Sequence, residues 1–248
     1  MPGVTRAFLT WRPPFSRDRV GAVRRRFDNE TTLSWLLSGL AGMTGATAFT
    51  HSSGYFVTFM TGNTERSVLG YFSGTPHLAL ASTALIAAFL AGVVVASLLR
   101  RHLWKRHAHG ATVVTTVALV LATMFDLELN GWTGRDVTFT PIALISFGMG
   151  ALNVSFVRNG EVSIPLSYVT GTLVKLGQGI ERHISGGTVF EWLGYAIVYV
   201  SFIVGAFVGG LLALATSGAQ LLLATTAVCA VISGYTYFHV DRAQVEVA

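Results

Sequence analysis

The chain has 248 residues, of which 52% are hydrophobic and only 12% charged, and its mean hydropathy is +0.57. Because about a quarter of the residues of a soluble protein are charged, this composition excludes an ordinary water-soluble domain. The formal net charge of +5 comes from the ends and loops, which indicates membrane topology and no nucleic-acid partner. The single cysteine, Cys229, excludes an intrachain disulfide.

Residues 1–30 form a basic segment, with the run Arg24-Arg25-Arg26 just before the first apolar stretch. We interpret this segment as a cytoplasmic arm that orients the chain and is attracted to anionic lipid. The pattern also resembles an export signal, because Ala46-Thr47-Ala48 imitates a cleavage site. Against that alternative, the residues after the arm recur later in the chain, which favours a structural role for them.

Beyond the arm, four kinds of segment each occur twice, in the same order. A stretch rich in small residues comes first, a short helix with a polar start second, and two long apolar runs follow. In the first half they lie at 33–50, 61–72, 78–99 and 111–127, and in the second half at 141–157, 170–184, 193–215 and 219–238. A run of about 20 apolar residues crosses a ~30 Å hydrocarbon core as a helix. Because these runs are continuous and do not alternate, the sequence predicts an all-α integral membrane protein.

This organisation divides the chain into three parts. Residues 1–30 are the cytoplasmic arm, residues 31–240 a single membrane domain, and residues 241–248 a cytoplasmic tail. Repeat one covers about 31–130 and repeat two about 138–240. Small residues at every fourth position of the first long apolar run in each half predict close helix packing: Ala84, Ala88, Gly92 and Ala96, then Ser201, Gly205, Gly209 and Ala213.

The charge pattern predicts how the chain crosses the membrane. The arm and the basic loop at 100–109 should both be cytoplasmic, so an even number of crossings separates them. The helix at 61–72 spans only ~18 Å, so the motif segment is broken or re-entrant and makes no full crossing. Each half then has three crossings. The prediction is six transmembrane helices as two inverted three-span repeats, with both termini cytoplasmic. The alternative is a full crossing by each motif segment, which gives eight spans and parallel halves.

The polar starts of the two short helices carry the candidate site. Met60-Thr61-Gly62-Asn63-Thr64 recurs 109 residues later as Val169-Thr170-Gly171-Thr172-Leu173. Glycine permits an irregular backbone, and Thr and Asn supply side-chain hydrogen bonds and can cap a helix start. A helix start also presents N–H groups and a partial positive charge. In transporters with broken helices, two such helix starts meet near the membrane midplane and hold the substrate there.

Two cations follow the motifs at equivalent positions, Arg66 and Lys175. A cation at the bilayer centre costs about 2.5–3.5 kcal/mol, which indicates a water-filled cavity, a paired carboxylate or interfacial depth. With the helix starts also positive, an anion is one candidate ligand. The alternative is that both side chains are anchors at the membrane surface. The predicted ligand-binding residues are therefore Thr61, Gly62, Asn63, Thr64, Arg66, Asn153, Thr170, Gly171, Thr172 and Lys175.

Other polar residues receive a plainer interpretation. Thr44 and Asn153 match across the repeat and are expected either to line the same cavity or to bond between helices. His102, His107 and His109 are expected in a solvated basic loop, and Asp126, Glu128 and Asp136 in or near a solvated outer loop. The sequence contains no metal-ligand run, no nucleophile elbow and no P-loop. It therefore predicts no metal or cofactor site and no enzymatic activity.

The motif also resembles a known family. Tyr55-Phe56-Val57-Thr58-Phe59 followed by Met60-Thr61-Gly62-Asn63-Thr64 is similar to the hallmark of the DUF1275 (YoaK, UPF0700) bacterial membrane proteins. The second half agrees through Gly148-Met149-Gly150-Ala151-Leu152-Asn153 and Tyr168-Val169-Thr170-Gly171-Thr172-Leu173, and the resemblance runs from about 33 to 238. It implies a multi-span protein of the inner membrane and no particular substrate.

Two positions depart from the family pattern. Gly45 stands where relatives often have an acidic residue, and Leu152-Asn153 stands where they have a Gln-Asn pair. If the acidic residue couples transport to protons or cations in relatives, this chain lacks it. The departure leaves room for a channel or an uncoupled carrier.

Three functions remain open from the sequence. The first is a small-solute transporter or channel in the lipid bilayer, with a central site at the paired Thr-Gly motifs. The second is a non-transporting membrane scaffold or regulatory protein, in which the motifs only close helix packing. The third, an intramembrane enzyme, has no recognisable constellation to support it. A water-accessible cavity that reaches both motifs favours the first and a dry contact between them the second; a homo-oligomer is compatible with either.

Overall fold

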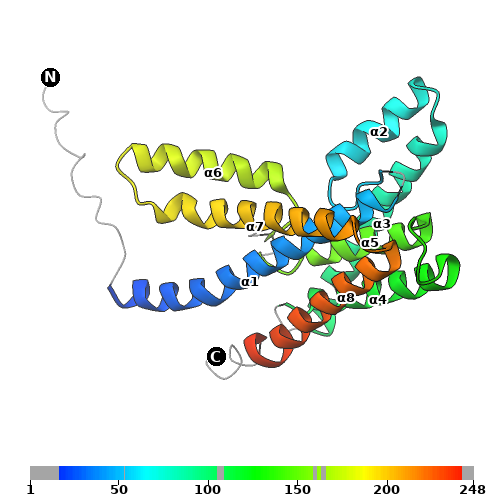
Figure 1. Ribbon diagram of the computed structural model, residues 1–248. Coiled ribbons are helices and arrows are strands. Elements are labelled where there is room, and N and C mark those ends of the chain that lie inside the picture. Colours follow the sequence, from blue (N-terminus) through cyan, green and yellow to red (C-terminus); the bar gives the residue numbers. More distant parts are fainter. Residues whose placement is uncertain (1–16, 53, 105–108, 159–160, 163–165, 242–248) are drawn as a thin grey trace, which may run out of the picture.

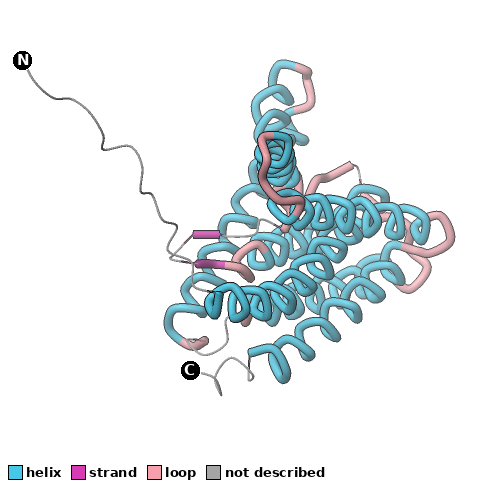
Figure 2. The backbone as a smooth tube through the Cα atoms, turned by 90° about the vertical axis from the view of Figure 1, so that its left-hand side faces the viewer, coloured by secondary structure: helices cyan, strands magenta, loops and turns pink. Residues whose placement is uncertain are grey.

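The computed structural model describes residues 17–52, 54–104, 109–158, 161–162 and 166–241, and these are almost entirely helical (Figure 1). In chain order the helices are α1 (Arg17–Thr50), α2 (Met60–Phe72), α3 (Pro76–His102), α4 (Ala111–Asn130), α5 (Phe139–Leu152), α6 (Val169–Ile184), α7 (Phe190–Ala213) and α8 (Gly218–Tyr235), with a π-helical turn η1 (Thr236–Val240) at the end. Two short strands, β1 (Val157–Arg158) and β2 (Glu161–Val162), pair antiparallel between α5 and α6 (Figure 2).

The first helix begins inside the predicted basic arm. Residues 17–30 of this arm form the opening turns of α1, which continues without interruption to Thr50. Residues 1–16 of the arm and residues 242–248 of the tail lie outside the described residues. The basic segment and the first small-residue segment are therefore joined by one continuous helix.

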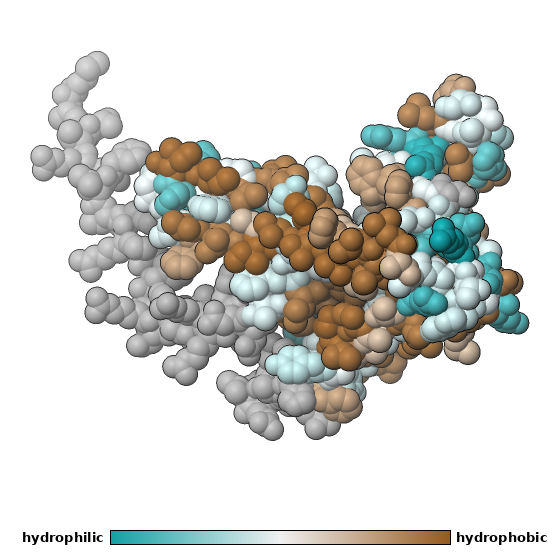
Figure 3. All heavy atoms as spheres, viewed as in Figure 1, coloured by the Kyte–Doolittle hydropathy of each residue, from teal (hydrophilic) through white to brown (hydrophobic). Residues whose placement is uncertain are grey.

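Four helices are long and apolar enough to cross a membrane: α3, α4, α7, and the stretch 218–238 that begins with α8. The shorter helix α5 is also apolar, at 14 residues. These helices confirm the predicted all-α membrane class, while the number of crossings stays a prediction. α3 and α7 have the highest mean hydropathy, 2.4 and 2.3, and the smallest buried shares. We infer that these two helices face lipid, and Figure 3 shows the apolar surface along α7.

The two halves of the chain make corresponding contacts. The expected correspondence pairs α1 with α5, α2 with α6, α3 with α7 and α4 with α8. In the structure α1 packs on α7 as α3 packs on α5, and α1 packs on α8 as α4 packs on α5. Each short helix packs on the long helix that follows it, and α4 packs on α8. Buried residues of α1, α4, α5 and α8 form the main core, among them Leu37, Leu119, Ile145 and Leu222.

Glycines allow the closest helix crossings. A Cβ at Gly205 of α7 would overlap the backbone carbonyl of Gly39 on α1, and a Cβ at Gly92 of α3 would overlap that of Phe147 on α5. Both glycines belong to the small-residue stripes that the sequence indicated. Lipid tails are as apolar as the helix surfaces, so the hydrophobic effect does not drive membrane helices together. They associate instead through close backbone packing of this kind. The equivalent crossings α1–α7 and α3–α5 therefore depend on equivalent glycines.

A row of hydroxyl contacts joins α4 to α8. The hydroxyl of Thr112 donates to that of Ser233 at 3.2 Å, and Thr123 and Thr226 share a hydrogen bond at 2.9 Å. Thr116 lies 3.3 Å from the sulfur of Cys229. Side-chain hydrogen bonds between membrane helices contribute about 0.6–2 kcal/mol each. The row explains why these two helices can be less apolar than α3 and α7 and still lie inside the bundle.

Candidate functional site

The two short helices begin in the same unusual way. α2 has Phe59 at its N-cap and α6 has Tyr168, and neither cap position makes a side-chain hydrogen bond. Thr61 and Thr170 are the second residues of their helices, so they do not cap the starts as the sequence analysis allowed. A Cβ at Gly62 would overlap the ring of Phe59, and one at Gly171 would overlap the ring of Tyr168. Each motif glycine therefore lets an aromatic ring lie across the first turn of its helix.

Both helix starts line one cavity of about 800 Å³. The cavity opens where the surface is hollowed between the α2–α3 and α6–α7 hairpins (Figure 3). Among the described residues, its lining consists of glycine, aliphatic and aromatic residues, one methionine, several hydroxyl-bearing residues and one asparagine, with no charged side chain: Gly42, Gly45, Ala46, Phe49, Thr50, Phe56, Thr58, Phe59, Met60, Thr61, Phe89 and Val93 from the first half, and Asn153, Ser167, Tyr168, Val169, Thr170, Phe202 and Ala206 from the second. The cavity thus draws on both halves and is mostly apolar.

The structure brings Thr61, Thr170 and Asn153 together at this cavity. Gly62 and Gly171 lie directly beneath the rings of two lining residues. These five of the ten predicted ligand-binding residues form or support one concave surface. That they bind a ligand stays a prediction.

Three further predicted residues are occupied by local hydrogen bonds. The buried amide of Asn63 donates to the carbonyl of Phe56 at 2.7 Å, which ties α2 to the preceding loop. Thr172, its equivalent, is buried and donates to the carbonyl of Tyr168 at 3.3 Å. Thr64 is exposed and donates to the carbonyl of Met60 at 2.9 Å. None of the three lines the cavity.

Arg66 and Lys175 point elsewhere. The guanidinium of Arg66 donates to the carbonyl of Gly54 at 2.8 Å and lies 4.8 Å from the centre of the Phe56 ring. The ammonium of Lys175 lies 5.6 Å from the centre of the Tyr195 ring on α7. Neither side chain lines the cavity, so the structure does not bring the two cations to a shared ligand.

Asn153 is the most fully bonded polar residue of the lining. Its amide donates to the hydroxyl of Ser167 at 2.7 Å and to the carbonyl of Met149 at 2.8 Å, and its carbonyl accepts from the backbone N–H of Ser167 at 3.1 Å. In the first half Gly45 takes the corresponding place, because a Cβ there would lie 2.8 Å from the hydroxyl of Thr58. Thr44, the expected match of Asn153, donates back to the carbonyl of Leu40 and does not line the cavity.

Several polar residues that the sequence indicated as solvated are buried in the structure. Asp126 and His109, both expected in solvated loops, are 0% and 2% exposed, whereas Glu128 and Asp136 are exposed as expected. His109 Nδ1 lies 2.7 Å from a carboxylate oxygen of Asp241. For Asp126, the sequence did contain a signal of burial, because its carboxylate lies four residues before the end of the apolar helix α4. His107 lies outside the described residues.

The His109–Asp241 pair is expected to hold the end of the chain to the bundle. Asp241→Asn keeps the shape of the side chain but removes its charge, so we expect the free energy of unfolding to fall by about 1–3 kcal/mol. Thermal unfolding in detergent would measure the loss. The exposed pair Arg182–Glu191, also at 2.7 Å, is the control, and Glu191→Gln should change stability little. Equal effects of the two substitutions would contradict a structural role for the buried pair.

The long apolar helices, the lipid-facing surface and the cavity between helices define a multi-pass membrane protein. A family model described as "Protein of unknown function (DUF1275)" matches residues 33–235, and the chain belongs to this family. The chain is also 28% identical, over 191 residues, to the UPF0700 transmembrane protein RA0705 of Rhizobium meliloti (strain 1021); the match covers 76% of this chain and 78% of the relative. No solved structure matches the chain.

Proposed function

We propose that the protein is a transporter or channel for a small solute, with its central site in the cavity between the starts of α2 and α6. The observation that carries this proposal is that both motif starts line one cavity instead of packing against each other. Ligand sites between membrane helices commonly lie where broken helices from two halves meet. A scaffold in which the motifs only close helix packing would have no use for a space of about 800 Å³ there.

The lining favours a neutral solute over an anion. Among the described residues that line it, the polar side chains are hydroxyls and one amide, with Asn153 and Thr58 contributed by opposite halves. The lining also includes aromatic side chains, among them Phe49 and Phe56, whose stacked rings have their centroids 5.1 Å apart. Largely apolar pockets with a few polar groups bind small molecules by shape and one or two hydrogen bonds. We therefore assign the site to a small, largely apolar solute with a hydrogen-bonding group.

We also propose six spans in two inverted halves. Figure 1 shows α1, α4 and α7 running in one direction through the bundle and α3, α5 and α8 in the other. Each helix of the first half thus runs opposite to its counterpart in the second half. The starts of α2 and α6 face the same cavity and the two helices lead away from it on opposite sides. This arrangement supports the inverted repeat of transporters with broken helices.

Filling the cavity tests the proposed function. Thr61→Trp and Thr170→Trp would enter the cavity from opposite halves, and we expect each to lower solute flux in proteoliposomes at least about tenfold, the factor that ~1.4 kcal/mol gives. The panel should contain neutral solutes, anions and cations. Thr64→Trp, on the exposed side of α2, is the matched control and should retain flux. Flux of no solute by the folded wild-type protein, or flux insensitive to both fillers, would overturn the proposal.

The topology prediction places both termini and the α3–α4 connection in the cytoplasm of a bacterial cell, with the protein in the inner membrane. Its basis is the basic content of these segments. In a Cys229→Ala background, Arg101→Cys should be protected from an impermeant thiol reagent added outside. Asp136→Cys, at the other end of α4, should react. Labelling of Arg101→Cys from outside would contradict the orientation.

A further inference from the structure

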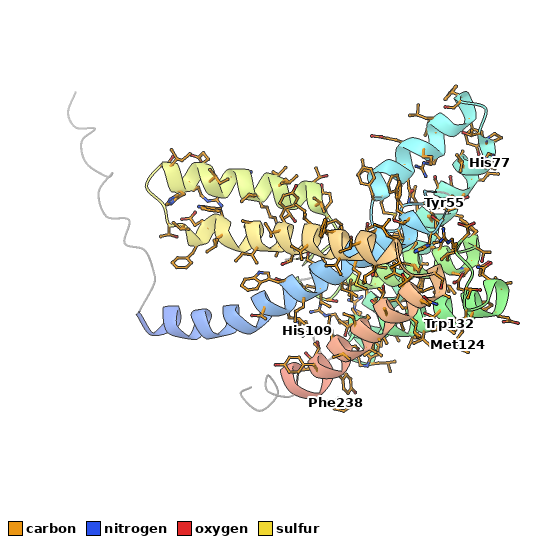
Figure 4. The ribbon with its side chains drawn as sticks, in the orientation of Figure 1. Tyr55, His77, His109, Met124, Trp132 and Phe238 are labelled. Carbon is orange, nitrogen blue, oxygen red and sulfur yellow. The ribbon has the colours of Figure 1, made fainter. Side chains whose placement is uncertain are left out.

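The cavity lies at the middle of the two helices that face lipid. Phe89 is the middle residue of the 27-residue helix α3, and Phe202 is one of the two middle residues of the 24-residue helix α7; both line the cavity. At 1.5 Å per residue, the ends of these helices are roughly 16–20 Å away. Figure 4 shows His77 and Trp132 toward one end of the bundle and His109 toward the other. Because half of a hydrocarbon core is about 15 Å, the cavity lies near the membrane midplane.

The two short helices leave the side of the cavity open. Each packs on the first part of the long helix that follows it, so α2 leads from the cavity to the start of α3 and α6 leads to the start of α7. Since α3 and α7 run in opposite directions, α2 and α6 lead to opposite ends of the bundle (Figure 1). The gap between their two starts therefore faces the side of the bundle, where the bilayer lies.

The rim of this opening is apolar and exposed. Phe49, Phe59 and Tyr168 line the cavity and are still 46%, 46% and 58% exposed. Leu90 and Ile203, the neighbours of the two middle lining residues, are exposed on α3 and α7. The apolar surface of α7 reaches the hollow (Figure 3). The mouth is thus continuous with the surface that faces lipid, and no charged side chain of the described lining marks an aqueous entrance.

Two hydroxyls inside the cavity have no hydrogen-bond partner among the described residues. Thr61 and Thr170 are the second residues of α2 and α6, so the carbonyl four residues before each lies outside its helix. Thr64 and Thr172, further along the same helices, donate to the carbonyl four residues earlier. Lipid tails cannot bond to a hydroxyl, and an unsatisfied polar group in the hydrocarbon is costly. A ligand with its own polar group would satisfy both hydroxyls.

We propose, on the basis of the proposed function, that the cavity receives its solute sideways from the hydrocarbon of the bilayer. The solute is a membrane-dissolved amphiphile with a small uncharged polar group, of the class of long-chain alcohols. The hydroxyls of Thr61 and Thr170 bind the polar group, and the aromatic rings contact the part of the chain next to it. The rest of the chain passes between Phe59 and Tyr168 into the lipid. A charged head group is disfavoured because no charged side chain of the described lining would pair with it.

Spin labels at the mouth test the lateral opening. Nitroxides on Phe59→Cys and Tyr168→Cys, in a Cys229→Ala background in nanodiscs, should collide more often with oxygen, which concentrates in hydrocarbon, than with a water-soluble nickel chelate. Their ratio of collision rates should match that of Ile203→Cys, a lipid-facing control that is 46% exposed, as Phe59 is. Asp136→Cys, in an exposed loop, should show the opposite ratio. A mouth that favours the nickel chelate opens to water, and a mouth protected from both reagents is covered by another chain; either result would overturn the proposal.

Photolabelling tests the class of solute. A long-chain alcohol with a diazirine beside its hydroxyl should form adducts at the cavity lining in nanodiscs, and the matching diazirine alkane should not be enriched there. Thr61→Val with Thr170→Val keeps the shape of both side chains and should lower the alcohol adducts roughly tenfold, the factor that ~1.4 kcal/mol gives. Thr64→Val, which does not line the cavity, should leave them unchanged. Equal labelling by alcohol and alkane, or equal labelling of the double variant and the wild type, would contradict the assigned solute.

The two readouts separate this inference from the proposed function. Flux of a water-soluble neutral solute that the cavity fillers block, together with a mouth that faces water, would retain the transporter and refute the lateral route. A mouth that faces lipid and binds the alcohol, in a protein that moves no solute of the panel or of this class, would retain the lateral site and refute transport.

Discussion

Gly205→Leu is expected to prevent assembly of the native bundle. Its Cβ would overlap the backbone carbonyl of Gly39, and a backbone atom, unlike the end of a side chain, cannot move aside. Overpacking of a core usually costs about 1–3 kcal/mol, and we expect more than about 3 kcal/mol here because two helix backbones must separate. Size-exclusion chromatography and thermal unfolding after membrane extraction would measure the loss.

Gly210→Leu is the matched control. Gly210 lies on the same helix five residues later, and no atom lies within 4 Å of a Cβ built there. Leucine at this position should be tolerated and should favour the helix. Gly92→Leu, at the equivalent crossing of α3 on α5, should be as damaging as Gly205→Leu. Native stability of Gly205→Leu would show that the α1–α7 crossing is not set by its glycines.

The long helices were predictable because hydropathy along a membrane helix is continuous. The limits of the shorter elements were not, because local hydrogen bonds decide them. The second small-residue segment was expected to end at 157, but α5 ends at Leu152 since Asn153 turns to bond with Ser167. α4 was expected to end at 127 and continues to Asn130, whose amide bonds to Asp126. The added turn follows Asp126, whose carboxylate is buried in the bundle.

The candidate site was predictable in its position but not in its charge. The repeat at 109 residues indicated that the two helix starts belong together, and Thr61 and Thr170 line one cavity. The partners of Arg66 and Lys175 lie in the irregular loop after α1 and on α7, and no periodicity in the motif reveals them. A long cationic side chain can reach a carbonyl or a ring away from its own turn of helix. The charge of a motif residue therefore says little about the charge of the cavity.

The motif glycines carry the last prediction. A Cβ at Gly62 would overlap the ring of Phe59, and one at Gly171 that of Tyr168, and both rings line the cavity. A ring, unlike a backbone carbonyl, can swing away about its χ angles. We therefore expect Gly62→Ala and Gly171→Ala to fold and to narrow the cavity by displacing these rings into it. The larger substitutions Gly62→Leu and Gly171→Leu should abolish function or assembly.

Thiol labelling measures the effect without knowledge of the solute. With Thr170→Cys as reporter in a Cys229→Ala background, Gly62→Ala should slow labelling roughly tenfold. This factor corresponds to ~1.4 kcal/mol of additional free energy for the reagent to reach the cysteine in the cavity. Gly177→Ala on α6 is the control, because no atom lies within 4 Å of its Cβ, and it should leave labelling unchanged. Adding Phe59→Ala to Gly62→Ala removes the displaced ring, so labelling should recover. If the double variant is still labelled slowly, displacement of the Phe59 ring is not the cause, because no ring then remains to block the cavity. The glycine would instead act through the backbone conformation at the start of α2.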